Sequence, residues 1–359
     1  MKRWNGLRHP RRRSRIEACI RLAPLTAMAL AAGGAAHAQS SVTLYGILDA
    51  GIQYRTHADG AHSAVNLQNY GVLPSQIGIT GTEDLGGGMQ AIFRLEQGLN
   101  LNDGSATVPG LAFFRGAWVG LKGGFGTVTM GRQFSVLFDR TVFYDPLLYA
   151  SYSGQGVLVP LAANFIDNAI KYQSPDIAGF SGEALAATGG VAGNSRSGRV
   201  LEAGAQYAGN GFGVSAVIHQ SYGAASSTAD TSAEQRVVGV LAAHWDIDRL
   251  SLYGGAERQT GSLEPAKTVA WGGARYRLDP AIGFAAGIYH TFSNTPSVGH
   301  PTLYIASGTY ALSKRTFAYV NLGYSHNTSG STQPVYEYDT LPVAGVSQFG
   351  AMAGMSHTF

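Results

Sequence analysis

Hydrophobic and polar residues alternate along most of this chain with a period of two. Segment 89–100 shows the pattern most clearly, with Met89 and Phe93 at one parity and Arg94 and Glu96 at the other. A period of two places such sets on opposite faces of a β-strand. The same alternation returns in four other segments: 42–54, 201–207, 212–221 and 316–325. The pattern predicts an all-β protein.

The connections between these segments are alternately tight and long. Seven tight joints are rich in Gly, Asp, Asn and Pro, which are turn-forming residues. Eight long connections lie between them: 55–74, 101–112, 134–167, 189–198, 223–235, 260–267, 293–301 and 327–346. Short turns at one end and long loops at the other are typical of an outer-membrane barrel. Together they predict sixteen antiparallel strands.

Aromatic residues support a barrel in a membrane. The last predicted strand, 347–359, has a mostly apolar face and stops at Phe359, which we expect to serve as a C-terminal assembly signal. Other rings near segment ends, Trp271 and Tyr289 among them, fit girdles at the membrane interface. Ordinary core aromatics remain the alternative for any one of these rings.

Residues 1–38 predict an exported protein. A run of Arg residues precedes an apolar stretch and the small-residue site Ala36-His37-Ala38, as in a cleaved signal peptide. Residues 39–359 then form the barrel domain. The leader holds eight of the 25 basic and one of the 22 acidic residues, so the remainder has a net charge of −4. This charge gives no reason to expect a nucleic-acid partner.

Composition separates the barrel from other classes. Cys19 is the sole cysteine and lies in the leader, so neither a disulfide framework nor a cysteine metal site is expected. No apolar run reaches the ~18 residues of a transmembrane helix. The mean hydropathy of the chain is close to zero, which a soluble β-sandwich would share. A sandwich protein of this length would normally divide into two domains, however, and no linker is evident.

Several local motifs resemble the trimeric general porins of Gram-negative bacteria. The motifs are the segments 41–51, 81–88, 117–121, 125–133 and 172–175, together with the Ser-His-Thr-Phe ending. The resemblance implies a transmembrane 16-stranded antiparallel β-barrel in the outer membrane, a homotrimer, and passive diffusion of small hydrophilic solutes and ions. It also implies contact with outer-membrane lipids and lipopolysaccharide, and insertion by the barrel-assembly machinery. In this family the third long loop folds inward and narrows the pore.

The longest connection, 134–167, matches that third loop and carries candidate constriction charges. Loops of this length are uncommon unless they are functional. We expect the loop to fold into the lumen, with a surface lid as the alternative. Its candidate constriction residues are Asp139, Arg140, Asp145 and Asp167.

The opposing wall of the constriction is expected to be basic. Arg94 is a lumen residue by parity, and Arg115 and Arg132 lie in family-like stretches. Parity places Arg115 and Arg132 with apolar neighbours, and a charge on the lipid face costs roughly 2–4 kcal/mol. We expect either a bulge near Gly116 or Gly131 that redirects them, or positions at strand ends, at a subunit interface or in a rim salt bridge.

The chain departs from the family pattern at two positions. Gln76 stands where the family often has Arg, and Phe165 precedes Ile166-Asp167-Asn168 without the usual Arg. A less positive wall predicts that this pore prefers anions less than its relatives do. With the net charge of −4, the prediction includes a mild preference for cations.

Two other functions are alternatives to a general pore. A substrate-selective channel, for example for organic anions or sugars, would also explain the missing basic residues. A barrel hydrolase has less support, because the chain lacks Gly-x-Ser-x-Gly and His-Glu-x-x-His motifs. No catalytic residues, metal or cofactor are therefore expected.

Overall fold

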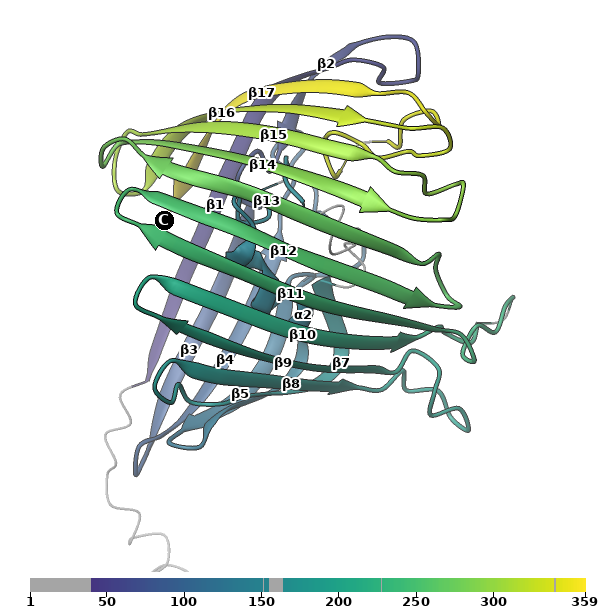
Figure 1. Cartoon of the computed structure of the whole chain (residues 1–359). Helices are drawn as coiled ribbons and strands as arrows, with labels where there is room; N and C mark the ends of the chain where they lie inside the picture. Colours follow the sequence, from purple (N-terminus) through teal and green to yellow (C-terminus); the bar gives the residue numbers. More distant parts are fainter. Residues whose placement is uncertain (1–39, 151, 155–163, 227, 339) are drawn as a thin grey trace, which may run out of the picture.

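The computed structural model describes residues 40–150, 152–154, 164–226, 228–338 and 340–359. The predicted signal peptide, 1–38, lies outside this part of the chain. A single antiparallel sheet closes on itself (Figure 1). Its strands are β1 (Ser41–Arg55), β2 (Ala64–Asn69), β3 (Gln76–Gly86), β4 (Met89–Gly98), β5 (Gly116–Gly123), β6 (Gly126–Phe134), β7 (Phe165–Gln173), β8 (Phe180–Ala187), β9 (Val200–Gly209), β10 (Phe212–Tyr222), β11 (Gln235–Ile247), β12 (Leu250–Gly261), β13 (Lys267–Arg277), β14 (Ile282–Phe292), β15 (Thr302–Ala311), β16 (Thr316–His326) and β17 (Gln348–Thr358).

The first and last strands close the barrel. β1 pairs with β17 on one side, for example Gly51 with Gly354. On its other side β1 pairs with β2 along one half and with β3 along the other half. β2 and β3 are therefore two halves of one barrel strand, interrupted by residues 70–75. The predicted sixteen-stranded antiparallel barrel is confirmed.

The alternation of side chains is inverted relative to a soluble protein. On β16, Val320 and Leu322 are 51% and 44% exposed, whereas Tyr319 and Asn321 are 3% and 0% exposed. Apolar residues thus cover the outer face while polar residues fill the inside. An outer face of this kind is stable against lipid hydrocarbon and unstable against water.

The two ends of the barrel differ as the turn chemistry predicts. Short turns and the C-terminus lie at one end, and the long loops lie at the other (Figure 1). Asn210 and Gly211 join β9 to β10 with φ of 52° and 75°, which is the two-residue hairpin geometry that Asn-Gly favours. By the convention of outer-membrane barrels the short turns are periplasmic. No helix in the described ranges is long and apolar enough to cross a membrane.

The third long connection folds into the barrel, as predicted. This loop, residues 135–164 and called L3 here, begins with α2 (Val136–Thr141) and η1 (Val142–Tyr144). α2 contacts β9 and β10 from the inside (Figure 1). Val136 and Leu137 have no exposed surface. Apolar packing of α2 on the inner wall therefore holds L3 in the lumen.

Candidate functional site

Ion pairs fix the first turn of L3 to the barrel wall. Ser135 caps α2 by accepting a hydrogen bond from the Phe138 N–H. Arg140 is buried and lies 3.3 Å from the Glu183 carboxylate on β8. Asp139 lies 2.5 Å from Lys171 on β7. Two predicted constriction charges, Asp139 and Arg140, are therefore in L3, and each is paired with the wall.

A second anchor holds the middle of L3. The Asp145 carboxylate accepts hydrogen bonds from the Tyr289 hydroxyl and from the N–H groups of Leu147 and Tyr149, and its side chain has no exposed surface. The Trp271 indole N–H donates to the Tyr144 carbonyl at 3.0 Å. Asp145 was expected to face the pore, and this placement corrects that expectation. The carboxylate is a structural acceptor because three donors converge on it.

Trp271 and Tyr289 also differ from the sequence expectation. Both side chains are at least 94% buried inside the barrel, where they contact L3. They are core aromatics, which was the alternative to membrane-interface girdle residues.

Arg132 and Asp167 form an ion pair near the ends of their strands. Asp167 belongs to β7 and not to L3, which corrects its assignment to the loop. Its carboxylate lies 2.6 Å from the Arg132 guanidinium, and its side chain is 65% exposed. The β6–β7 register is irregular between Gly131 and Gln133, as expected near Gly131. Arg132 keeps the sequence parity of Met130, but its guanidinium lies 5.1 and 5.6 Å from the centroids of the Phe114 and Phe165 rings. Arg115 contacts the same Phe165 ring, so Arg132 forms its salt bridge beside the wall candidate Arg115.

Arg115 lies on the lumen side, near Arg94 and Gln76. It precedes β5, and its guanidinium lies 2.9 Å from the Glu96 carboxylate. Gln76 donates to the same carboxylate at 3.2 Å. Arg94 stacks over the Trp118 ring with 5.7 Å between the guanidinium carbon and the ring centroid. Glu96 thus neutralises one of the predicted basic residues.

The interruption between β2 and β3 adds a second inward segment. Asp49 on β1 accepts hydrogen bonds from the N–H groups of Gly71 and Leu73 at 2.8 and 3.1 Å. The Tyr319 hydroxyl donates to the same carboxylate at 2.8 Å. Residues 70–75, called the insert here, are thereby drawn into the lumen. The sequence predicted a long polar connection over 55–74, and this inward segment was missed.

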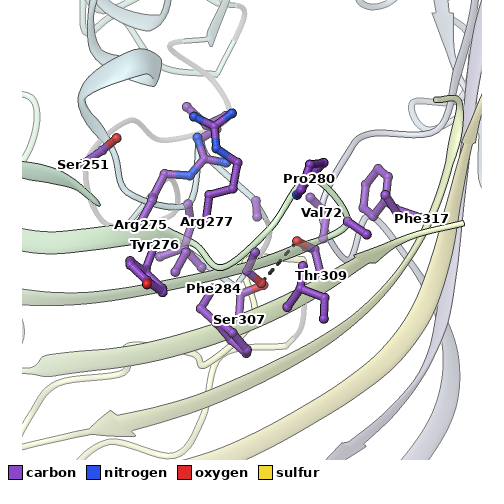
Figure 2. A pocket seen from close by; sticks show the side chains of 18 of the residues that line it. Val72, Ser251, Arg275, Tyr276, Arg277, Pro280, Phe284, Ser307, Thr309 and Phe317 are labelled. Atoms are coloured by element: carbon purple, nitrogen blue, oxygen red, sulfur yellow. Dashed lines mark hydrogen bonds between the residues drawn. The ribbon is translucent and has the colours of Figure 1, made fainter. Parts of the chain in front are cut away.

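A basic cavity opens below L3 at the periplasmic end of the lumen. Its volume is about 620 Å³. Arg249, Arg275, Arg277 and Lys314 line it together with a single acidic residue, Asp279. Arg275 and Arg277 lie two residues apart on β13, and their side chains extend side by side into the cavity (Figure 2). We call this cavity the vestibule. Its cations were missed, although the parity that Arg275 and Arg277 share with Trp271 is a usable signal.

Comparisons with known proteins identify the family. The model of the Gram-negative porin family matches residues 25–330. This chain belongs to the Gram-negative porin family. It is 30% identical to outer membrane porin protein 32 of Delftia acidovorans, over 92% of this chain and 97% of the relative. It is also 30% identical to the major outer membrane protein P.IB of Neisseria meningitidis serogroup B, over 86% and 95% of the two chains.

A solved structure gives the same assignment. The anion-selective porin from Comamonas acidovorans matches with a TM-score of 0.77 and 25% identity, covering 89% of this chain and all of that chain. The protein is thus an outer-membrane porin, and its barrel provides a water-filled path for passive diffusion of small hydrophilic solutes and ions. A sixteen-stranded barrel is wide enough to leave such a path beside L3.

Proposed function

We propose that this porin prefers small anions over cations. The proposal rests on a difference between acidic and basic side chains in the part of the lumen that the structure describes: the acidic groups are mostly paired, whereas several basic groups form no ion pair. Four acidic groups are held by partners: Glu96 by Arg115, Asp139 by Lys171, Glu183 by Arg140 and Asp49 by backbone N–H groups. The carboxylate oxygens of Glu337 lack such a partner in the described ranges but are buried away from the open path. Within the described residues, no acid forms a hydrogen bond or an ion pair with Arg275 or Arg277, although Arg275 interacts electrostatically with the buried Asp145 carboxylate. A lumen with neutralised acids and open cations attracts anions.

The solved relative described as anion-selective supports the same direction. The sequence alone suggested weaker anion preference, because Gln76 and Phe165 replace basic residues. The vestibule supplies cations elsewhere along the same path, so the local loss at Gln76 need not set the selectivity of the whole pore.

Reversal potential across a tenfold KCl gradient in a planar bilayer tests this proposal. We expect a potential displaced toward the chloride equilibrium value. The variant R275Q/R277Q should lose much of that displacement. R258Q is the matched control, because Arg258 bonds Thr268 near the extracellular end of β12, at the opposite parity from the buried Glu257. A potassium-directed potential in the unaltered protein would refute the proposal.

We further propose that the porin assembles as a homotrimer whose outer apolar face contacts lipid and lipopolysaccharide. Membership of the family supports the trimer. Native mass measurement in detergent tests it: three chains per particle are expected, and a particle containing one chain would contradict it.

A further inference from the structure

The vestibule combines cationic and apolar surfaces around one half-open cavity. The cross-strand register explains the cationic side. Arg275 lies opposite Ala285 and Arg277 lies opposite Gly283, so small neighbours on β14 leave room for both guanidinium groups. The Arg277 N–H donates to the Arg249 carbonyl at 2.9 Å, which places a third cation beside them. The cations are therefore gathered by strand pairing and do not depend on flexible loops.

The only acidic residue among those that line the vestibule is already engaged. Asp279 accepts hydrogen bonds from the N–H groups of Ala281 and Ile282 at 2.7 and 2.8 Å, which closes the β13–β14 turn. Arg249 uses one N–H to bond the Leu278 carbonyl at 2.7 Å. In the described part of the chain, no hydrogen bond or ion pair connects Arg275 or Arg277 to an acid. Their planar donor groups remain available for a carboxylate.

Hydroxyl groups continue the polar surface beyond the cations. Ser307 pairs with Ala285 in the sheet, and Thr309 pairs with Gly283. Both residues line the same cavity as Arg275 and Arg277 (Figure 2). The β14 residues between them are too small to separate the two groups. Each hydroxyl already donates its proton within the barrel, Ser307 to the Asn321 Oδ1 at 2.7 Å and Thr309 to the Gly283 carbonyl at 3.3 Å, so a ligand meets only their acceptor oxygens.

The opposite side of the vestibule is apolar. Val72 and Leu73 of the insert line it, together with Pro146 and Leu147 of L3. Pro146 packs on the β13 wall so closely that a Cβ at Gly273 would lie 2.5 Å from its ring. Phe317 of β16 completes this surface and packs against the buried core. A small inorganic anion would leave these apolar groups unused, and a neutral sugar would leave the guanidinium groups unpaired.

We propose that the vestibule is a binding site for small organic carboxylates that carry an apolar or aromatic body. The carboxylate pairs with Arg275 and Arg277, and the apolar body lies against Pro146, Leu147 and Phe317. Such a site would concentrate amphipathic organic anions at the periplasmic end of the pore. The inference rests on the proposed anion preference and deepens it by naming a solute class.

Block of chloride current by benzoate tests the site in bilayers that contain the whole porin. Benzoate added to the periplasmic side should reduce conductance with a saturating concentration dependence. Benzamide, which has the ring without the charge, should not block. Acetate, which has the charge without the ring, should require about tenfold more for half-block, as expected when the apolar contact is missing.

Variants separate the two halves of the site. R275Q/R277Q should raise the half-blocking benzoate concentration by about tenfold or more, because charge-assisted hydrogen bonds are lost. F317A should weaken benzoate block and leave acetate block unchanged, and it keeps every charge in place. R258Q should match the unaltered protein. Equal block by benzoate and benzamide, or unchanged block in both site variants, would overturn the proposal.

The reversal potential in the same bilayers tells the two proposals apart. Chloride preference without benzoate-specific block overturns the binding site and leaves the proposed selectivity standing. Benzoate-specific block without chloride preference supports the site and overturns the selectivity.

Discussion

Removing the Asp145 carboxylate should loosen L3 without unfolding the barrel. The variant D145A deletes the acceptor for the Tyr289 hydroxyl and for the N–H groups of Leu147 and Tyr149. The β-ladder does not pass through Asp145, so the strands keep all of their pairings. The Trp271–Tyr144 hydrogen bond before Asp145 and the Gln53–Tyr152 hydrogen bond after it still hold the two ends of the affected stretch. The expected effect is therefore local, in residues 143–150.

The size of the effect follows from the three lost hydrogen bonds. A hydrogen bond to a charged group contributes about 1.5–3 kcal/mol. Because water reaches a pore lumen and will satisfy some of the freed donors, we take the lower value for each, about 1.5 kcal/mol. Three such bonds sum to roughly 4–5 kcal/mol of lost docking free energy. D145N keeps one acceptor oxygen and should lose about half as much.

Single-channel recording reports the docking of L3 directly. D145A should show larger current fluctuations and more frequent changes between conductance levels, with D145N intermediate. Y289F removes one donor and should produce a smaller change, and the double variant D145N/Y289F should be less than additive because the two groups share one bond. Current noise in D145A equal to that of the unaltered protein would refute the anchoring role of Asp145.

Two other features give testable outcomes. The buried carboxylate oxygens of Glu337 have no hydrogen-bond partner within the described residues, and burial raises the pKa of this group from its ordinary 4.5 to about 8. Docking of the loop 327–347 should be most stable below pH 4.5, and its equilibrium constant should fall by up to about tenfold per pH unit as the pH rises to about 8. The rate of protease cleavage within this loop measures the effect. A pH dependence that persists in E337Q would contradict it. At the seam, a Cβ on Gly46 would lie 2.3 Å from the Phe359 ring. G46V should lower barrel stability by about 1–3 kcal/mol, which is measured as a lower temperature for the gel-mobility shift. Deletion of Phe359 should reduce the amount of folded porin in the outer-membrane fraction. An unchanged amount of folded porin would contradict the assembly role of Phe359.

The barrel could be predicted from the sequence because its cause is local. Arg94 and Glu96 face the lumen, as their parity on β4 predicts. Each strand alternates apolar residues that face lipid with polar residues that face water, and the residues Asn210-Gly211 favour their turn geometry by themselves. Strand number then follows from counting connections. None of these inferences requires knowledge of which strands meet.

The roles of the L3 charges could not be predicted in the same way. Asp139, Arg140 and Asp145 were correctly placed in the loop, but their partners Lys171, Glu183 and Tyr289 lie on other strands. A loop sequence does not reveal which wall positions it will meet once folded inward. The exposure of the L3 charges therefore depends on tertiary packing, and neither hydrophobic periodicity nor a sequence motif predicts that packing.

The vestibule was missed for a different reason. The family motifs point to basic residues near β5 and β6, and none of these motifs covers β13. Arg275 and Arg277 share their parity with the buried Trp271, so the signal was present in the sequence. The insert at 70–75 gave a weaker signal, because Asp49, which holds it, lies on another strand.

Single-channel conductance of the purified porin in planar bilayers tests the central claim most directly. We expect stepwise insertions of open channels whose conductance rises in proportion to the conductivity of the KCl solution, because ions cross through bulk-like water beside L3. A correctly folded barrel that inserts into the bilayer and carries no current would contradict an open, water-filled lumen.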